Sequence, residues 1–160
     1  MKPLEATRAA IAALLAGGVL LACAATDDGD PTPAVLDALW PGGRDTVELS
    51  QLAGRAPLAA DEDFRAVEIA RDGATSHHVV SIRGAEVPHR HERHDLLVVL
   101  LKGFGSMRLA DEVSTVGEGS ILYIPRGTPH AFTNRSDAVA VAYAVYLPAF
   151  DGTDRVLIEP

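Results

Sequence analysis

The chain has little sulfur and few aromatic side chains, and it lacks an apolar stretch long enough to span a membrane. Cys23 is the only cysteine, so no intramolecular disulfide can form. The same lone thiol has no activating neighbour nearby, which argues against a catalytic cysteine. The run of Ala, Leu, Ile, Val and Gly at residues 11–22 has 12 residues, whereas a transmembrane helix needs about 20.

Basic residues are also scarce. The chain has 14 Lys and Arg against 22 Asp and Glu, a net charge of −8. This balance excludes a basic groove for nucleic acid and disfavours direct binding to anionic lipid. A hydrophobic content of 48% in 160 residues excludes intrinsic disorder and indicates one packed domain.

The N-terminus has the features of a bacterial export signal. Lys2 and Arg8 precede the apolar run, and "LLAC" at residues 20–23 resembles the lipobox of bacterial lipoproteins. The resemblance implies removal of residues 1–22 and lipid modification of Cys23. It therefore predicts a lipid-anchored protein of the bacterial cell envelope, facing the periplasm or the outer surface. The alternative is an ordinary signal peptide with a chance cysteine.

The next segments contain proline, glycine and small residues. We expect residues 23–34 to form a flexible tether and residues 35–63 to form an N-terminal extension that packs on the main domain. Within that extension, "VLDALW" (35–40) is predicted as one helical turn, ended by "PGG". A short strand is expected near "TVELS" (46–50).

From Phe64 onward the pattern is that of short strands separated by Gly, Pro and Asp turns, with no long helix. In the last of these runs, valines and tyrosines alternate with alanines, which suits a curved sheet packed on both faces. The pattern predicts an all-β sandwich or barrel over residues 64–160. The expected strands are 64–70, 76–83, 95–102, a hairpin around 111–112, 120–125, 130–134 and 138–148.

The stretch "HRHERHD" holds half of the chain's six histidines. Side chains at positions i and i+2 of a strand point to the same face. We therefore expect the imidazoles of His89 and His91 to lie together, with Arg90 turned away. Two imidazoles on one face form half of a metal site.

The second half of the site lies in "GSILYIPRGTPHAFTN". The spacing Gly119-x5-Pro125-x-Gly127-x2-His130-x3-Asn134 resembles the second signature motif of the cupin family at every position. The resemblance implies that the proline and glycine build a turn, that His130 is a metal ligand, and that Asn134 ties down backbone. The implied fold is a small antiparallel jelly-roll β-barrel.

The first cupin motif is present in a modified form. His89-x-His91 and the closing Gly103 match, but the position of the family's glutamate falls on Asp95 by one count and on Leu96 by another. The resemblance thus implies a metal site of His89, His91 and His130 with Asp95 as fourth ligand. His94 or water is the alternative at that position. Asp95 could instead cap a turn or orient a liganding histidine.

This ligand set suits divalent Fe, Mn, Ni, Cu or Zn. We expect a small oxygen-bearing ligand and metal-dependent chemistry, either a dioxygenase-like oxidoreductase or an isomerase. The rival hypothesis is a non-catalytic small-molecule or metal-binding module. Because cupins often pair through sheet edges, the resemblance also allows a homodimer.

Other polar and aromatic residues are expected to have ordinary roles. His77 and His78 are predicted at the surface, and Arg126 as a surface charge or an anion contact. Core or pocket-wall positions are expected for the aromatic and sulfur side chains at 107, 123, 132, 143 and 146.

Overall fold

The computed structural model describes residues 33–158. The predicted signal peptide, Cys23 and the first ten residues of the tether lie outside this range. The described elements are β1 (Val35–Trp40), β2 (Gly43–Glu48), α1 (Leu49–Leu52), η1 (Ala53–Arg55), β3 (Phe64–Arg71), β4 (Ser76–Ile82), β5 (His89–His91), β6 (Asp95–Lys102), β7 (Phe104–Leu109), β8 (Glu112–Gly117), β9 (Ile121–Ile124), β10 (His130–Asn134), β11 (Ala140–Leu147) and β12 (Arg155–Leu157). None of the helices within 33–158 is long and apolar enough to cross a membrane.

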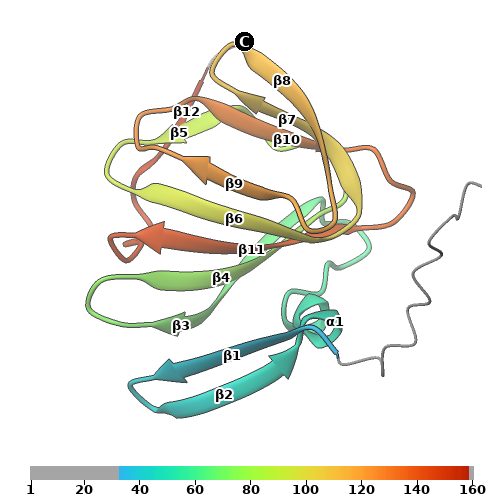
Figure 1. Cartoon of the computed structure of the whole chain (residues 1–160). Coiled ribbons are helices and arrows are strands. Elements are labelled where there is room, and N and C mark those ends of the chain that lie inside the picture. Colours follow the sequence, from blue (N-terminus) through green and yellow to red (C-terminus); the bar gives the residue numbers. More distant parts are fainter. Residues whose placement is uncertain (1–32, 159–160) are drawn as a thin grey trace, which may run out of the picture. The chain divides into compact units, whose positions relative to one another are not determined.

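Two five-stranded antiparallel sheets form the jelly roll, which confirms the predicted fold class (Figure 1). One sheet has the strand order β12-β5-β10-β7-β8 and the other β3-β4-β11-β6-β9. In the first sheet, β5 pairs with both β10 and β12, which lie far from it in the sequence. This topology brings the two histidine motifs onto adjacent strands.

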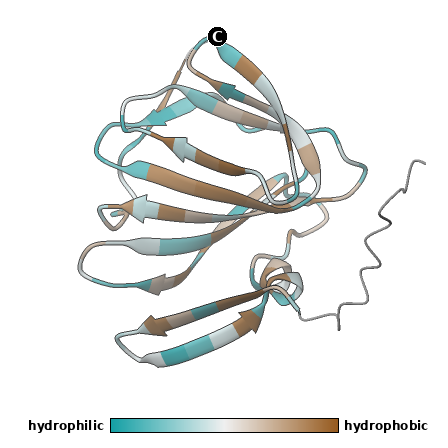
Figure 2. Ribbon diagram, viewed as in Figure 1, coloured by the Kyte–Doolittle hydropathy of each residue, from teal (hydrophilic) through white to brown (hydrophobic). Residues whose placement is uncertain are grey.

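The strand β6 carries six consecutive apolar residues and is coloured hydrophobic along most of its length (Figure 2). Its sequence alternates between two apolar environments. Leu96 and Leu100 are buried toward the space between the sheets, whereas Leu97 is 38% exposed on the other face. The continuous apolar run thus reflects a strand with apolar residues on both faces.

The alternation in β11 divides its side chains between two hydrophobic clusters. Its alanines at 140, 142 and 144 belong to the inner cluster between the sheets, together with Phe132 and Met107. Val141 belongs to an outer cluster instead. Because alanine side chains are short, this strand leaves unfilled volume between the two sheets.

The N-terminal extension covers part of the outer face of the sheet β3-β4-β11-β6-β9. Val47 of β2, Leu52 of α1 and Ala56 are buried against Val79 and Val141. The predicted helical turn at 35–40 is wrong, because these residues form strand β1, paired antiparallel with β2. The alternating exposure of this strand has the period of two that a strand on a surface requires.

Gly105 of β7 lies where two strands approach too closely for any side chain. A Cβ atom there would overlap the carbonyl oxygen of Thr133 and lie 2.6 Å from Cζ of Phe132. Phe132 is part of the inner cluster. A side chain at position 105 would therefore displace the backbone of β10 or the ring of Phe132.

We predict that Gly105→Ala lowers the free energy of unfolding by at least about 2 kcal/mol, because it overpacks the join of β7 and β10. Gly84→Ala is the matched control, since a Cβ atom there meets nothing within 4 Å. Urea denaturation of the three proteins measures the difference. Equal stability of Gly105→Ala and Gly84→Ala would contradict the packing described.

Candidate metal centre

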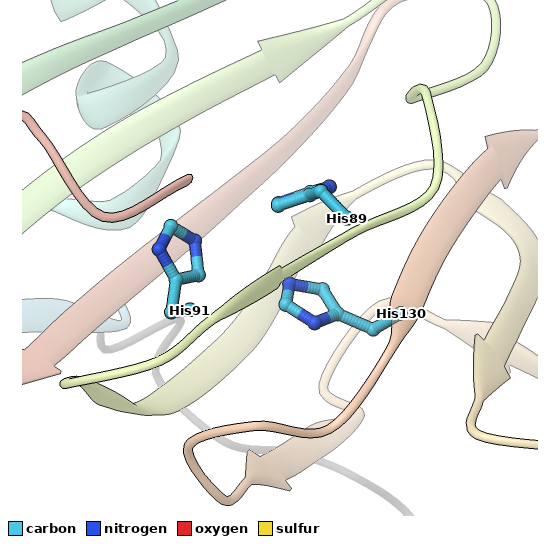
Figure 3. Close-up of side chains that lie close together, drawn as sticks. All are labelled: His89, His91 and His130. Atoms are coloured by element: carbon cyan, nitrogen blue, oxygen red, sulfur yellow. The ribbon is translucent and has the colours of Figure 1, made fainter. Parts of the chain in front are cut away.

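Three buried histidines converge between the sheets (Figure 3). His89 and His91 lie on β5, and His130 on β10 is the direct cross-strand partner of His89. All three side chains are at most 4% exposed. Ring nitrogens, one from each residue, lie within 4.8 Å of one another. The predicted trio is thus brought together by the fold.

The hydrogen bonds at the back of each ring fix which nitrogen carries the proton. The Nδ1 atoms of His89 and His130 each face the carbonyl oxygen two residues earlier, at 2.9 Å. Nδ1 of His91 faces Oδ1 of Asp154 at 2.7 Å. A carbonyl or carboxylate oxygen only accepts, so all three Nδ1 atoms must donate. Each Nε2 therefore keeps a free lone pair, as a metal ligand requires.

Burial also keeps these rings neutral. It lowers the pKa of His89 to about 3, with the neighbouring His130 adding to the effect. Burial likewise lowers the pKa of His91 and of His130. Neutral imidazole is the form that binds metal, so protons compete poorly for this site at neutral pH.

Asp154 orients His91 by accepting a hydrogen bond from its Nδ1 atom. The sequence pattern did not reveal this residue. Its carboxylate is 3% exposed and accepts hydrogen bonds from three groups. These are Nδ1 of His91 at 2.7 Å, Nδ1 of His94 at 2.6 Å and the backbone N–H of Arg93 at 2.7 Å. Although burial raises its pKa, these bonds outweigh that effect and lower the pKa of Asp154. The carboxylate thus stays charged behind two imidazoles.

His91, His94 and Asp154 form a second group of residues with the chemistry of metal ligands. Ligand atoms about 2.1 Å from a tetrahedral metal lie about 3.4 Å apart. The nitrogen–oxygen distances here, 2.6 and 2.7 Å, are shorter and fit hydrogen bonds. This group is therefore a hydrogen-bonded clamp that orients His91.

The structure does not bring Asp95 to the three histidines. Leu96 faces the cavity, so the adjacent Asp95 points to the other side of β6. There its two carboxylate oxygens accept bonds from the Arg126 side chain at 3.0 and 2.9 Å. Asp95 also accepts the backbone N–H of Arg126 at 2.8 Å. These contacts lower the pKa of Asp95 to about 2. The expected fourth ligand is instead the cap of the β9–β10 turn.

His94 does not take the fourth position either. It is 2% exposed, but Nδ1 faces Asp154 and Nε2 faces the carbonyl oxygen of Ala149 at 3.3 Å. Both ring nitrogens are directed at protein oxygens, and His94 does not belong to the close group of nitrogens that the trio forms. Neither Asp95 nor His94 is therefore placed to be the fourth ligand of the metal. This leaves that coordination position to water or to an external ligand.

The turn before β10 is built by the motif residues. Gly127 has a φ of 79°, a conformation that favours glycine, and its N–H donates to the carbonyl of His91 at 2.6 Å. This bond ties the turn to β5. Asn134, as expected, binds backbone: its Nδ2 donates to the carbonyls of Ala138, Arg83 and Ile82 at 2.7, 3.1 and 3.2 Å.

The three imidazoles open into a cavity of about 150 Å³. Its other walls are mostly apolar. They include Ile82, Leu100, Phe132, Met107, Tyr146 and the alanines of β11. Two further charged residues that sequence reasoning missed, Glu86 and Arg155, also line it. The site therefore has one polar end and an apolar body.

Several residues lie elsewhere than expected. His78 is 7% exposed and its Nε2 lies 3.0 Å from Oγ of Ser76, so it is buried and not at the surface. His77 is half-buried, with Nδ1 2.6 Å from the hydroxyl of Tyr143. Tyr123 is 58% exposed, so it is neither core nor cavity wall. Aromatic neighbours explain the first two, because His77 packs against Trp40, and His78 against Tyr146 and Phe150.

Comparison with known proteins agrees with this geometry. The model of the family described as "Cupin domain" matches residues 77–146. An uncharacterised protein of Aquifex aeolicus (strain VF5) is 35% identical over 98 residues, which cover 61% of this chain and 80% of that protein.

Two solved structures resemble the fold. KdgF from Halomonas sp. has a TM-score of 0.54 at 21% identity, covering 59% of this chain and 88% of that one. Pac13 of Streptomyces, described as a nucleoside dehydratase, has a TM-score of 0.54 at 15% identity, covering 67% and 88%. At these identities the likeness shows the fold alone.

The clamp predicts that Asp154→Asn weakens metal binding. The carboxylate offers one oxygen to the Nδ1–H of His91 and the other to that of His94. The amide of asparagine has only one oxygen, so its NH2 group would face one of these N–H donors and push that imidazole ring out of place. We expect a 10- to 100-fold loss of Zn²⁺ affinity, the usual cost of losing such a partner, in competition titrations with a chelator.

Asp151→Asn is the matched control, because Asp151 lies on the same segment but binds the exposed side chain of Arg93. Its Zn²⁺ affinity should equal that of the wild type. An Asp154→Asn protein that binds as tightly as this control would show that the clamp does not position His91.

Proposed function

Since the chain belongs to the cupin superfamily, we propose that it is a metal-dependent small-molecule protein in which His89, His91 and His130 bind one divalent transition metal. The observation that carries this proposal is the set of three Nδ1–H groups held by acceptors behind the rings. That arrangement leaves three Nε2 lone pairs free in a group whose ring nitrogens lie within 4.8 Å of one another, and three neutral imidazoles are an ordinary ligand set for Fe, Mn, Ni, Cu or Zn.

Three protein ligands leave coordination positions open toward the cavity. A metal there would supply Lewis acidity to an oxygen-bearing ligand, because neutral imidazoles leave its charge uncompensated. Isomerisation or dioxygenase-like oxidation is the chemistry that this site supports best. The apolar walls exclude bulk water and hold the body of the ligand.

Glu86 is the group of this chain best suited to move a proton at the ligand. It lines the same cavity, and its Oε2 accepts the N–H of Phe132 at 3.0 Å, which fixes its position. Burial raises the pKa of this carboxyl, so it keeps its proton to higher pH than an ordinary glutamate. A protonated carboxyl can donate to a ligand oxygen.

We further propose that the protein is anchored to the bacterial cell envelope through a lipid on Cys23. The support is the export signal and the lipobox-like "LLAC" in residues that lie outside the described range. One anchoring cysteine followed by a small, proline-containing tether would leave the cupin domain free in the periplasm or at the outer surface.

The metal proposal predicts about one equivalent of metal per chain in protein purified without oxygen, measured by elemental analysis. His89→Ala and His130→Ala should each lose most of it, since two imidazoles bind a metal far more weakly than three. His77→Ala is the control, because His77 contacts Trp40 and Tyr143 away from the trio. Metal content equal in all four proteins, or absent from the wild type, would refute the site.

The anchoring proposal predicts that Cys23→Ser abolishes incorporation of labelled fatty acid. Because the acyl chains provide the membrane attachment, the variant should move from the membrane fraction to the soluble fraction after cell lysis. Immunoblots of the two fractions measure this. Equal membrane retention of the variant and the wild type would reject the lipid anchor.

A further inference from the structure

Arg155 is a charged group that the proposed metal site leaves unused. It lies on β12, directly opposite His91 on β5, and cross-strand partners point to the same face of a sheet. Its side chain accordingly lines the cavity. Within residues 33–158 it is the one basic side chain, apart from the histidines, in that lining.

The guanidinium of Arg155 has no carboxylate partner among the described residues. Its Nη2 lies 3.5 Å from the carbonyl oxygen of Val87, a long contact. It lies 3.4 Å from Nδ1 of His89, which already donates to Val87 and cannot accept. The guanidinium also lies over the ring of Phe64, 5.8 Å from its centre. Most of its donors are therefore free for a ligand.

The charges around this end of the cavity favour an anion, since Glu86, which also lines the cavity, keeps its proton to higher pH than an ordinary glutamate because burial raises its pKa. The trio of imidazoles is neutral and would leave a bound metal fully positive. Arg155 adds a second positive charge close enough to help burial lower the pKa of His89 and of His130. The carboxylate of Asp154 lies behind His91, and its oxygens are taken up by three N–H groups. An anion between metal and guanidinium would meet both charges.

The apolar walls and the volume of the cavity limit which groups can be attached to the anionic group of the ligand. Its far walls are aliphatic and aromatic, with Ile82, Leu100 and Phe132 among them. The volume, about 150 Å³, is about that of an apolar protein cavity that accepts benzene. A sugar acid or a dicarboxylate would place polar groups against these walls without partners.

We propose that the cavity binds a small monocarboxylate with a compact apolar body, in which Arg155 pairs with the carboxylate. This inference rests on the proposed function, because the metal on the three histidines supplies the second contact to the same carboxylate. The apolar body then packs against the far walls. Arg155 is thus the side chain that adds to the metal's preference for an acid over the corresponding neutral molecule.

Benzoate and benzamide test this, because they have the same shape and differ in charge. Isothermal titration of Zn²⁺-loaded wild type should show benzoate binding at least about tenfold more tightly than benzamide. Arg155→Met, which keeps length and removes charge, should reduce the preference severalfold, and only the part that the metal contributes should remain. Arg155→Lys should restore part of the lost preference, since an ammonium pairs with a carboxylate at one point.

Arg90→Met is the matched control. Arg90 lies on β5 next to His91, but it pairs with Glu92 outside the cavity. The Arg90→Met protein should therefore prefer benzoate over benzamide as strongly as the wild type does. Equal binding of the two probes to the wild type would overturn the inference, as would no binding of either at millimolar concentration. A preference of wild-type size in Arg155→Met would overturn it too.

The same samples separate this inference from the proposed function. Metal content is measured before each titration, and the titrations are repeated after removal of metal with a chelator. Protein that takes up no Zn²⁺ contradicts the metal site alone. If this metal-free protein still prefers benzoate in an Arg155-dependent way, the carboxylate pocket is supported without the metal site. If protein fully loaded with Zn²⁺ shows no such preference, the pocket is contradicted and the metal site is not.

Discussion

The hydrogen bonds behind the three imidazoles are the constraint on which the site depends. A histidine ring can bind a metal through either nitrogen. A hydrogen-bond acceptor at Nδ1 holds the proton on that atom and so leaves the lone pair of Nε2 for the metal. Two of these acceptors are local carbonyls, and the third is the buried carboxylate of Asp154. Asp154 comes from the segment just before β12, so the orientation of His91 depends on how the C-terminal strand joins the sheet.

The site also requires a cavity for the ligand, and the barrel provides it between the two sheets. Short side chains on the inner face of β11 leave a cavity where a bulkier strand would fill the core. Val141 of the same strand faces outward, where the N-terminal extension covers it, whereas Tyr146 lines the cavity. Polar groups then gather at one end of the cavity, because β5, β10 and β12 are neighbours there. An apolar pocket with a few convergent polar groups is the usual form of a small-molecule site.

Much of this architecture was predictable from the sequence. Alternating apolar residues and Gly or Pro turns predicted most strands, and the spacing of two motifs predicted that His89, His91 and His130 meet. The fourth position was not predictable, because the motif count gave Asp95 or Leu96 and only strand parity shows that Leu96 faces inward. Asp154 and Arg155 were missed because they lie about 60 residues from their partners and belong to no motif.

The central claim is that three imidazoles, and no carboxylate, hold the metal. The most direct measurement is a crystal structure of the metal-loaded protein with anomalous diffraction at the metal edge. The account predicts one peak bonded to the Nε2 atoms of His89, His91 and His130 at about 2.1 Å. Nδ1 of His91 should still bind Asp154. A peak bonded to Asp95, to Asp154 or to any Nδ1 atom of the trio would contradict it.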